Sequence, residues 1–403
     1  METRQERGKE IAQTMGKLIK KTKDGWLVPS QSSNAMYRVD ELFNCNCPDC
    51  QKRSVTCKHG YALRYYLQAE NAAGQVVHKQ RLTIGQAWSA YNAGQTSEIR
   101  LFDELLKDLV QEVEEPEQAM GRPRLALREQ VFCSIQKVYS QLSSRRAASL
   151  FGNAMAKGQI RHAPHFNAPS KLLNKAEITP LLQHLLAVTA SPLRSVESSF
   201  AVDSSGFRTT CFGQYAEQKY ALERQHNWLK AHICIGTKTN IVVGAIITDE
   251  NGADCPQFAP LIQTTTNNGF TVLEASADKA YSSRANYEVV NALGGQAYIP
   301  FKSNTSGKAV GSMLWKKMFH YFQMNQTEFY EHYHARSNVE STFAAIKRKF
   351  GDTVKSKNPI AQQNELLCKL IAYNLTVVIQ EMHELGIQPD FCTQSPRGEP
   401  KVA

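Results

Sequence analysis

The sequence predicts a multidomain protein in which a mixed α/β domain follows an all-α region and a small cysteine-rich module. Three observations support this organisation. A series of strand-like runs follows Pro192. Before that residue, apolar positions recur at the three- and four-residue spacing of amphipathic helices. Four of the ten cysteines lie between positions 45 and 57, which marks a separate small unit near the N-terminus.

The composition excludes several classes of protein. The chain has 403 residues, of which 42% are hydrophobic and 21% charged, as in globular proteins. Its first residues are charged and lack the apolar stretch of an export signal, and no run approaches the ~18 apolar residues of a membrane span. We therefore expect a cytoplasmic protein without membrane contact. In that reducing compartment, clustered cysteines favour a metal site over disulfides.

The cysteine-rich module is expected over residues 1–80, with a hairpin, a metal-binding knuckle and a helix between 26 and 67. Zinc prefers four thiolate or imidazole ligands in a tetrahedron, and closely spaced ligand pairs allow two tight turns to hold it. A C-x-C…C-x-H pattern supplies such pairs from Cys45, Cys47, Cys57 and His59. We expect these residues to bind one structural Zn²⁺. Cys50 is an alternative to Cys45 or Cys47 in the ligand set.

A helical linker is predicted over residues 81–118, and a basic helical region over 119–192. In the linker, Ser97 is placed to cap a helix that spans about 98–113, because the following apolar residues keep helical spacing. In the basic region, apolar spacing predicts helices throughout 125–190.

The charge changes sign between these two segments. Residues 103–117 hold seven acidic side chains, whereas residues 121–175 hold ten lysines and arginines and a single acid, a formal charge of +9. A segment of this charge predicts a surface for a polyanion such as DNA. Arg145 and Arg146 are its best candidates for phosphate contacts. The alternative is a solvated helix surface without a partner.

The α/β domain is predicted over residues 193–386. Residues 387–403 are polar and are predicted to form a disordered tail. Strands are expected at FAVD (200–203), AHICIG (231–236), IVVGAIIT (241–248), FTVLEASAD (270–278) and QAYIPF (296–301). Helices are expected near 256–265, 283–293, 336–350 and 364–385. Consecutive strands followed by alternating helices and strands are typical of a mixed sheet.

Two aspartates each end a predicted strand: Asp203 ends the first strand and Asp278 the fourth. An aspartate at a strand end is often only a turn residue. In a mixed sheet of this order, however, the first and fourth strands can be neighbours, and a helix packed at their ends would bring Glu340 beside both aspartates. Such carboxylates repel unless cations neutralise them, and hard oxygen ligands suit Mg²⁺ or Mn²⁺. Two ions about 4 Å apart can activate an attacking oxygen and stabilise a leaving oxygen at a phosphodiester.

The stretch HYHARSNVESTFAAIKRKF (332–350) places a tyrosine, an arginine and a lysine around this glutamate. The residues are Tyr333, Arg336, Glu340 and Lys347, at gaps of three, four and seven. At about 100° per residue, the four positions fall within roughly 60° of one another on one helix face. A solvated helix face is the simpler interpretation of such a stripe taken alone.

The two aspartates and the glutamate, in this order, resemble the acidic triad of DDE transposases. The Y-x2-R-x3-E-x6-K spacing resembles the Y-R-E-K signature of one large group of bacterial and archaeal insertion-sequence transposases. The hairpin with its C-x-C…C-x-H pattern resembles the SWIM zinc finger. The similarity extends from about Trp26 to Gly386. Only 61 residues lie between Asp278 and Glu340, too few for the long β insertion that some members carry there.

The resemblance implies an RNase H-like (retroviral-integrase-like) catalytic domain with two Mg²⁺ or Mn²⁺ ions on Asp203, Asp278 and Glu340. It also implies that Tyr333, Arg336 and Lys347 contact the DNA backbone near the scissile phosphate. Such a protein binds the terminal inverted repeats of its element, cleaves there and joins the 3′-OH to target DNA, with a homodimer in the synaptic complex. The alternatives are a catalytically inactive, transposase-derived DNA-binding regulator and an RNase H-fold nuclease.

Overall fold

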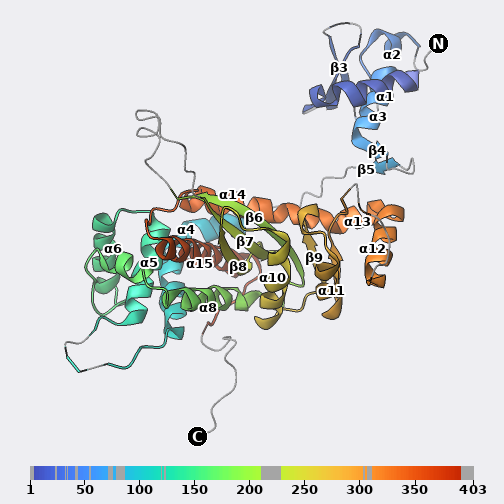
Figure 1. The fold of residues 1–403 in the computed structure, drawn as a ribbon. Coiled ribbons are helices and arrows are strands. Elements are labelled where there is room, and N and C mark those ends of the chain that lie inside the picture. Colours follow the sequence, from blue (N-terminus) through green and yellow to red (C-terminus); the bar gives the residue numbers. More distant parts are fainter. Residues whose placement is uncertain are drawn as a thin grey trace, which may run out of the picture. The chain divides into compact units, whose positions relative to one another are not determined.

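The structure is a computed structural model, in which the chain forms two compact units, Met1–Gly85 and Gln86–Ala403 (Figure 1). Each unit is described by itself. The residues described are 4–22, 25–31, 33, 35–40, 44–53, 56–70, 76–78, 87–118, 120–121, 124–209, 228–302, 305 and 311–391. Of the predicted segments, residues 81–86 of the linker and 392–403 of the tail lie outside this set.

The first unit contains a three-stranded antiparallel sheet in the order β1-β2-β3. Its elements are α1 (Arg4–Met15), β1 (Lys20–Thr22), β2 (Gly25–Pro29), β3 (Met36–Val39), α2 (Pro48–Arg53), α3 (Lys58–Leu67), β4 (Gln68–Glu70) and β5 (Val76–His78). Helix α3 packs against the sheet, and α1 packs against α3. The predicted hairpin and following helix are therefore confirmed.

Helix α1 was not anticipated, because its sequence offers Ile11 as the one strongly apolar residue and so shows little periodicity. Tertiary contacts with the rest of the first unit stabilise this helix instead. The Ile11 side chain is fully buried. The backbone of Gly8 approaches α3 so closely that a Cβ there would lie 2.5 Å from the Cβ of Tyr61. A larger residue at position 8 would separate the two helices.

The second unit begins with a helical region, as predicted. Its helices are α4 (Trp88–Leu109), α5 (Leu127–Ser140), α6 (Ser144–Ala156), α7 (Ala168–Leu173) and α8 (Ile178–Ala190). The capping role predicted for Ser97 is wrong, because α4 starts at Trp88. The Ser97 hydroxyl instead donates to the carbonyl of Ala93, one turn earlier, at 2.7 Å. A serine inside a helix satisfies its hydroxyl in this way without ending the helix.

The helical region and the sheet share one hydrophobic core. Helix α15 (Pro359–Glu384) packs against α4, α5, α7 and α8 and also contacts β8 of the sheet. On α4 and α5, the rings of Phe102 and Tyr139 stack with centroids 3.8 Å apart. The expected boundaries at 118 and 192 fall inside this unit, and they stay predictions.

The sheet of the second unit has five strands in the order β10-β9-β6-β7-β8. They are β6 (Ser199–Arg208), β7 (Trp228–Gly236), β8 (Val242–Asp249), β9 (Glu274–Ala277) and β10 (Gln296–Tyr298). β6 runs antiparallel to β7 and parallel to β9. The expected neighbourhood of the first and fourth strands is therefore confirmed, although β9 and β10 are shorter than predicted.

Helices complete the unit around this sheet (Figure 1). They are α10 (Cys255–Asn267), α11 (Arg284–Ala292), α12 (Met313–Met324), α13 (Gln326–Tyr333) and α14 (Ser337–Phe350), followed by α15. Between β10 and α14, the described residues form the helices α12 and α13 and a 3₁₀ turn at His334–Arg336. Helix α14 packs against β6 and so brings Glu340 to the central strand.

Asn374 connects α15 to the sheet. Its side chain accepts a hydrogen bond from the Val242 backbone N–H at 2.9 Å and donates one to the Val242 carbonyl at 2.7 Å. It also donates to the Thr189 hydroxyl at 2.9 Å. The fully buried amide therefore satisfies the backbone groups at the start of β8, which would otherwise be left without partners inside the core.

The stability of the second unit is predicted to depend on pH through Glu381 on α15. Burial, together with Glu384 and Glu197, raises the pKa of Glu381 from 4.5 to about 7. Between these values the folded chain holds a proton that the unfolded chain releases, so stability falls as the pH rises through this window. Glu381→Gln should remove this dependence and stabilise the protein at pH 8 by up to about 3 kcal/mol.

Urea unfolding of the wild type and of Glu381→Gln at pH 5 and pH 8 would measure this difference. Glu250→Gln is the matched control, because it removes the same charge from an exposed position that does not contribute to the pKa shift of Glu381. The control should change stability far less. Equal pH dependence in wild type and Glu381→Gln would contradict the prediction.

Candidate functional site

The four predicted zinc ligands lie together in the first unit. Cys45 forms an isolated bridge with Val39 of β3, and His59 lies in the first turn of α3. The ligand atoms of Cys45, Cys47, Cys57 and His59 all lie within 4.8 Å of one another, and all four residues are buried. Cys50 is partly exposed and is not part of this group.

The geometry of the group fits a tetrahedral ion. The Nδ1 atom of His59 lies 3.8 Å from the Cys45 sulfur and 3.7 Å from the Cys57 sulfur. Zinc bonds of about 2.3 Å to sulfur and 2.0 Å to nitrogen place tetrahedral ligand atoms roughly 3.5–3.8 Å apart. A hydrogen bond from Cys45, reinforced by His59, lowers the pKa of the Cys57 thiol to about 3. The Cys3His group therefore offers a thiolate in a buried tetrahedral set that suits zinc.

The predicted acidic residues meet at one end of the sheet in the second unit. Asp203 lies on β6, and Asp278 directly follows β9. The preceding residues, Val202 and Ala277, are partners in the parallel ladder, so Asp203 and Asp278 lie at the same level of neighbouring strands. The prediction that Asp203 ends the first strand is wrong, because β6 continues to Arg208. Glu340 lies in the first turn of α14, which packs on β6.

Arg336 bridges two of these carboxylates. Its Nη1 donates to Oδ2 of Asp203 at 2.7 Å, and its Nη2 donates to Oε1 of Glu340. The guanidinium also lies over the ring of Tyr333, 5.8 Å from the centroid. Sequence reasoning placed Arg336 on DNA and did not anticipate that it would pair with the acidic residues. Arg336, which sequence reasoning assigned to DNA, is therefore also a partner of the acidic residues.

The electrostatics of Asp203 show that the acidic residues influence one another. Burial raises the pKa of Asp203, and the negative charges of Asp278 and Glu340 add to the rise. The Ser204 backbone N–H and the Arg336 guanidinium act in the opposite direction. Asp278 also has the ordinary role of a strand-end aspartate, because its carboxylate accepts a hydrogen bond from the Ala280 N–H in the turn that follows.

The stripe predicted on one helix is divided between two. Helix α13 ends at Tyr333, a 3₁₀ turn spans His334–Arg336, and α14 begins at Ser337. The prediction of a single helix is therefore wrong in detail. Because every backbone angle at this junction remains near the right-handed helical region, Arg336 still lies one turn before Glu340.

Lys347 lies further along α14 and contacts the same face of β6. Its Nζ donates to the Ser205 hydroxyl at 2.7 Å and lies 5.1 Å from the centroid of the Phe207 ring. Asp203, Ser205 and Phe207 alternate along β6 and so share one face of the strand. Burial lowers the pKa of Lys347.

A fourth acidic residue, Asp254, lies beside β6 and was missed by sequence reasoning. It precedes α10 and accepts a hydrogen bond from the Ser204 hydroxyl at 2.7 Å. Lys230 and His232 of β7 lie 2.7 and 3.3 Å from its carboxylate. Ser204 alternates with Asp203 along β6, so this cluster belongs to the opposite face of the strand. The available signal was His232 within the predicted strand 231–236 and Lys230 directly before it.

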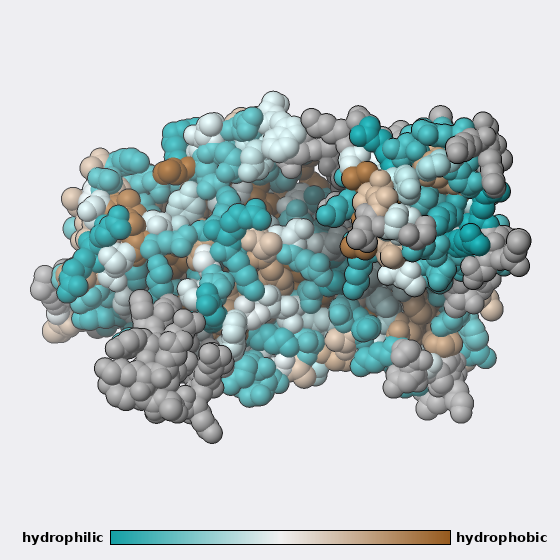
Figure 2. All heavy atoms as spheres, turned by 90° about the horizontal axis from the view of Figure 1, so that it is seen from above, coloured by the Kyte–Doolittle hydropathy of each residue, from teal (hydrophilic) through white to brown (hydrophobic). Residues whose placement is uncertain are grey.

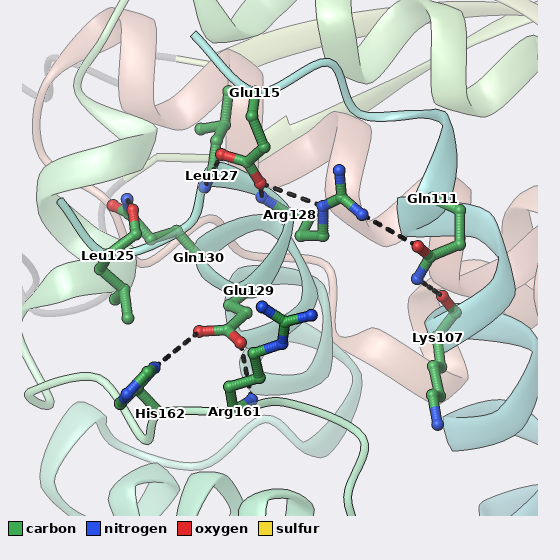
Figure 3. A network of polar contacts seen from close by, with 10 residues as sticks. All are labelled: Lys107, Gln111, Glu115, Leu125, Leu127, Arg128, Glu129, Gln130, Arg161 and His162. Carbon is green, nitrogen blue, oxygen red and sulfur yellow. Dashed lines mark hydrogen bonds and ion pairs between the residues drawn. The ribbon is translucent and has the colours of Figure 1, made fainter. Parts of the chain in front are cut away.

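The basic helical region is less charged in the fold than its sequence suggests. Arg128 pairs with Glu115 at 3.1 Å (Figure 3). Lys157 lies 3.7 Å from Asp103. The two acids come from the preceding acidic segment, which packs against the basic one. The charge of +9 counted along the chain is therefore partly compensated across the fold. The prediction from sequence separated the acidic and basic segments and so did not include this pairing.

Glu129, the single acid of the basic segment, is also paired. Its carboxylate accepts a hydrogen bond from the Arg161 backbone N–H at 2.6 Å and lies 4.0 Å from Nδ1 of His162 (Figure 3). Arg145 and Arg146 lie exposed on α6, and the Arg145 guanidinium lies 5.4 Å from the centroid of the Phe166 ring. The face seen in Figure 2 is mainly hydrophilic.

Among the residues that the structure describes, no helix combines the length and apolar character needed to cross a membrane.

Metal removal tests the Cys3His group. Metal analysis of the purified chain should find about one zinc per molecule, and Cys57→Ser should abolish this content. Because zinc binding to such groups supplies about 10–16 kcal/mol of folding free energy, chelation should unfold the first unit. Cys133→Ser, which alters a buried thiol of the second unit, is the matched control and should leave the zinc content unchanged. A chelated, metal-free first unit with unchanged circular dichroism would contradict the prediction.

Comparison with known families places this acidic group within a recognised domain. Residues 194–375 match the family model described as "Transposase DDE domain". The matched range contains Asp203, Asp278 and Glu340, together with Arg336. The match supports a DDE transposase.

Proposed function

We propose that this protein is a DNA transposase that binds the terminal inverted repeats of its insertion sequence and catalyses Mg²⁺-dependent cleavage and 3′-OH strand transfer. One observation carries the proposal: the carboxylates of Asp203, Asp278 and Glu340 come from different elements and converge at one end of the sheet. They do so inside the range that matches a transposase domain. The order β10-β9-β6-β7-β8 supports an RNase H-like fold for this domain.

In this proposal, Asp203, Asp278 and Glu340 hold two Mg²⁺ or Mn²⁺ ions. When bound, these ions would activate the attacking oxygen and stabilise the leaving oxygen of a phosphodiester. The Asp203 carboxylate accepts a hydrogen bond from the Ser204 N–H at 2.8 Å, which restrains its orientation. Asp278 is oriented by the turn that it caps. The chain thus presents its oxygen ligands on rigid elements.

The surrounding cations are assigned to the DNA backbone. Arg336 offers a planar fork that can hold a phosphate through two hydrogen bonds, whereas Lys347 acts as a point charge. Tyr333 supports Arg336 through its ring. Arg145 and Arg146 on α6 are proposed to contact the transposon end away from the cleaved bond, with a homodimer holding two ends together.

The zinc group is proposed to be a SWIM-type module. The antiparallel pairing of β2 with β3 before the cysteines supports this proposal, as does the placement of His59 at the start of α3. Its Zn²⁺ would be structural, because four protein ligands leave no position for a substrate.

Replacing any of the three acidic residues should abolish catalysis without loss of DNA binding. Glu340→Gln, Asp203→Asn and Asp278→Asn keep the shape of the side chain but remove the charge that a divalent cation requires. We expect nicking and strand transfer to fall by about a thousandfold or more, which corresponds to ~4 kcal/mol of transition-state stabilisation. The assay is Mg²⁺-dependent nicking of a duplex that carries the transposon end, with binding measured in Ca²⁺.

Asp254→Asn is the matched control, since it removes a carboxylate from the opposite face of β6. It should lower activity far less than the three substitutions above. Wild-type cleavage by Glu340→Gln would mean that this carboxylate is not a metal ligand. Cleavage without joining of the 3′-OH would instead favour a nuclease, and end binding without cleavage by the wild type would favour a DNA-binding regulator.

The contribution of α6 is tested through the salt dependence of DNA binding. Each phosphate contact that is lost reduces the slope of log affinity against log salt by about 0.9. Replacing Arg145 and Arg146 with Ala in the full chain should therefore weaken binding and flatten this slope by up to about 2. Lys175→Ala is a suitable control, because Lys175 already pairs with Glu177 at 3.2 Å. An unchanged slope would remove α6 from the DNA interface.

A further inference from the structure

Arg336 occupies the position from which a divalent cation would contact Asp203 and Glu340 at once. Its two terminal nitrogens divide between these residues, one bonding Oδ2 of Asp203 and the other Oε1 of Glu340. The side chains of Arg336 and Asp203 are 17% and 20% exposed, so their contact is largely buried, whereas the Glu340 side chain is 58% exposed. The guanidinium therefore compensates the same pair of carboxylates that the proposed function assigns to a metal ion.

A guanidinium and a divalent cation compete for such a pair. A carboxylate oxygen engaged in a charge-assisted hydrogen bond has less electron density to offer a metal. Two cations held within about 4 Å of each other also repel strongly in a partly buried site. Bridging by Arg336 and bridging by a metal ion are therefore alternative states of this carboxylate pair.

We propose that Arg336 is a resident counter-ion that keeps the Asp203–Glu340 pair closed to divalent cations until the backbone of bound DNA draws the guanidinium away. The inference rests on the proposed function and adds an order of events to it. DNA phosphate and the carboxylate pair are both partners that a guanidinium binds through two hydrogen bonds, so the exchange keeps its hydrogen bonding satisfied. Release of Arg336 then opens the carboxylate oxygens to the cation.

The local structure permits this exchange without a movement of the sheet. Arg336 lies in the 3₁₀ turn His334–Arg336 between α13 and α14, rather than within either helix. Its long side chain can rotate while Glu340 stays on α14 and Asp203 stays on β6. The ring of Tyr333, in contact with the guanidinium, lies at the end of α13 and provides a second surface along which Arg336 can move.

Thermodynamic linkage makes the consequence measurable. If DNA removes the competitor for the metal, DNA and metal must each increase the affinity of the protein for the other by the same factor. Couplings of this kind are typically about 5- to 150-fold. The coupling should depend on Arg336 and should vanish when the guanidinium is removed.

The test measures binding of Mn²⁺ alone to the zinc-loaded full chain by electron paramagnetic resonance, without DNA. Arg336→Ala should bind Mn²⁺ about 5- to 150-fold more tightly than the wild type. Arg336→Gln, which keeps most of the side-chain length, should behave in the same way and provides the measurement if Arg336→Ala does not fold. Lys347→Ala is the matched control, because it removes one positive charge from the same helix face but contacts Ser205 instead of the carboxylates.

The double variant Arg336→Ala/Glu340→Gln should lose the gain in affinity, which assigns the gain to the carboxylate pair. A short DNA duplex at low salt should then raise the Mn²⁺ affinity of the wild type and of Lys347→Ala, but not that of Arg336→Ala. Thermal unfolding of each variant confirms that the fold is retained.

The outcomes separate the two proposals. Wild-type Mn²⁺ binding that Arg336→Ala and Arg336→Gln leave unchanged or weaken would overturn the inference and leave the proposed function standing. An equal gain in Lys347→Ala would also overturn it, because the effect would then reflect net charge. If neither the wild type nor the variants bind Mn²⁺ at this pair, with or without DNA, the proposed function fails and the inference fails with it.

Discussion

The parallel pairing of β6 with β9 is the constraint on which the rest of the second unit depends. β6 lies at the centre of the sheet, with β7 bonded to one edge and β9 to the other. Because Val202 and Ala277 are register partners, Asp203 and Asp278 emerge side by side. A shift of one residue would turn Asp203 to the opposite face of the sheet, where Ser204 now bonds Asp254. The position of the acidic group is thus set by backbone hydrogen bonds.

Bringing acidic side chains together costs free energy, and the protein offsets this cost with a cation of its own. Arg336 bonds Asp203 and Glu340, while burial keeps the pKa of Asp203 raised. On the opposite face, Lys230 and Ser204 outweigh the effect of burial and lower the pKa of Asp254. The carboxylate of Asp254 on one face of β6 is therefore compensated by Lys230 and Ser204, and the Asp203–Glu340 pair on the other face by Arg336.

The helical region illustrates how a fold redistributes charge. The acidic residues that precede the basic segment do not form a separate linker surface, because α4 and α5 pack together and Glu115 and Asp103 pair with Arg128 and Lys157. Basic residues without such pairing, on the exposed side of α6, carry the proposed contact with DNA. Net charge along a chain therefore overestimates the charge that a partner meets.

The sequence by itself determined the mixed sheet and the helical region, and it allowed the first and fourth strands to be neighbours. It also identified Cys45, Cys47, Cys57 and His59, since ligand spacing and the succession of elements along the chain are local properties. It did not reveal α1, the Asp254 cluster or the bridge from Arg336 to Asp203. These depend on contacts between residues far apart in sequence, where packing and desolvation decide which charges meet. Only the tertiary structure showed that the arginine assigned to DNA also occupies the acidic site, because side-chain pairing across 133 positions leaves no periodic signal in the chain.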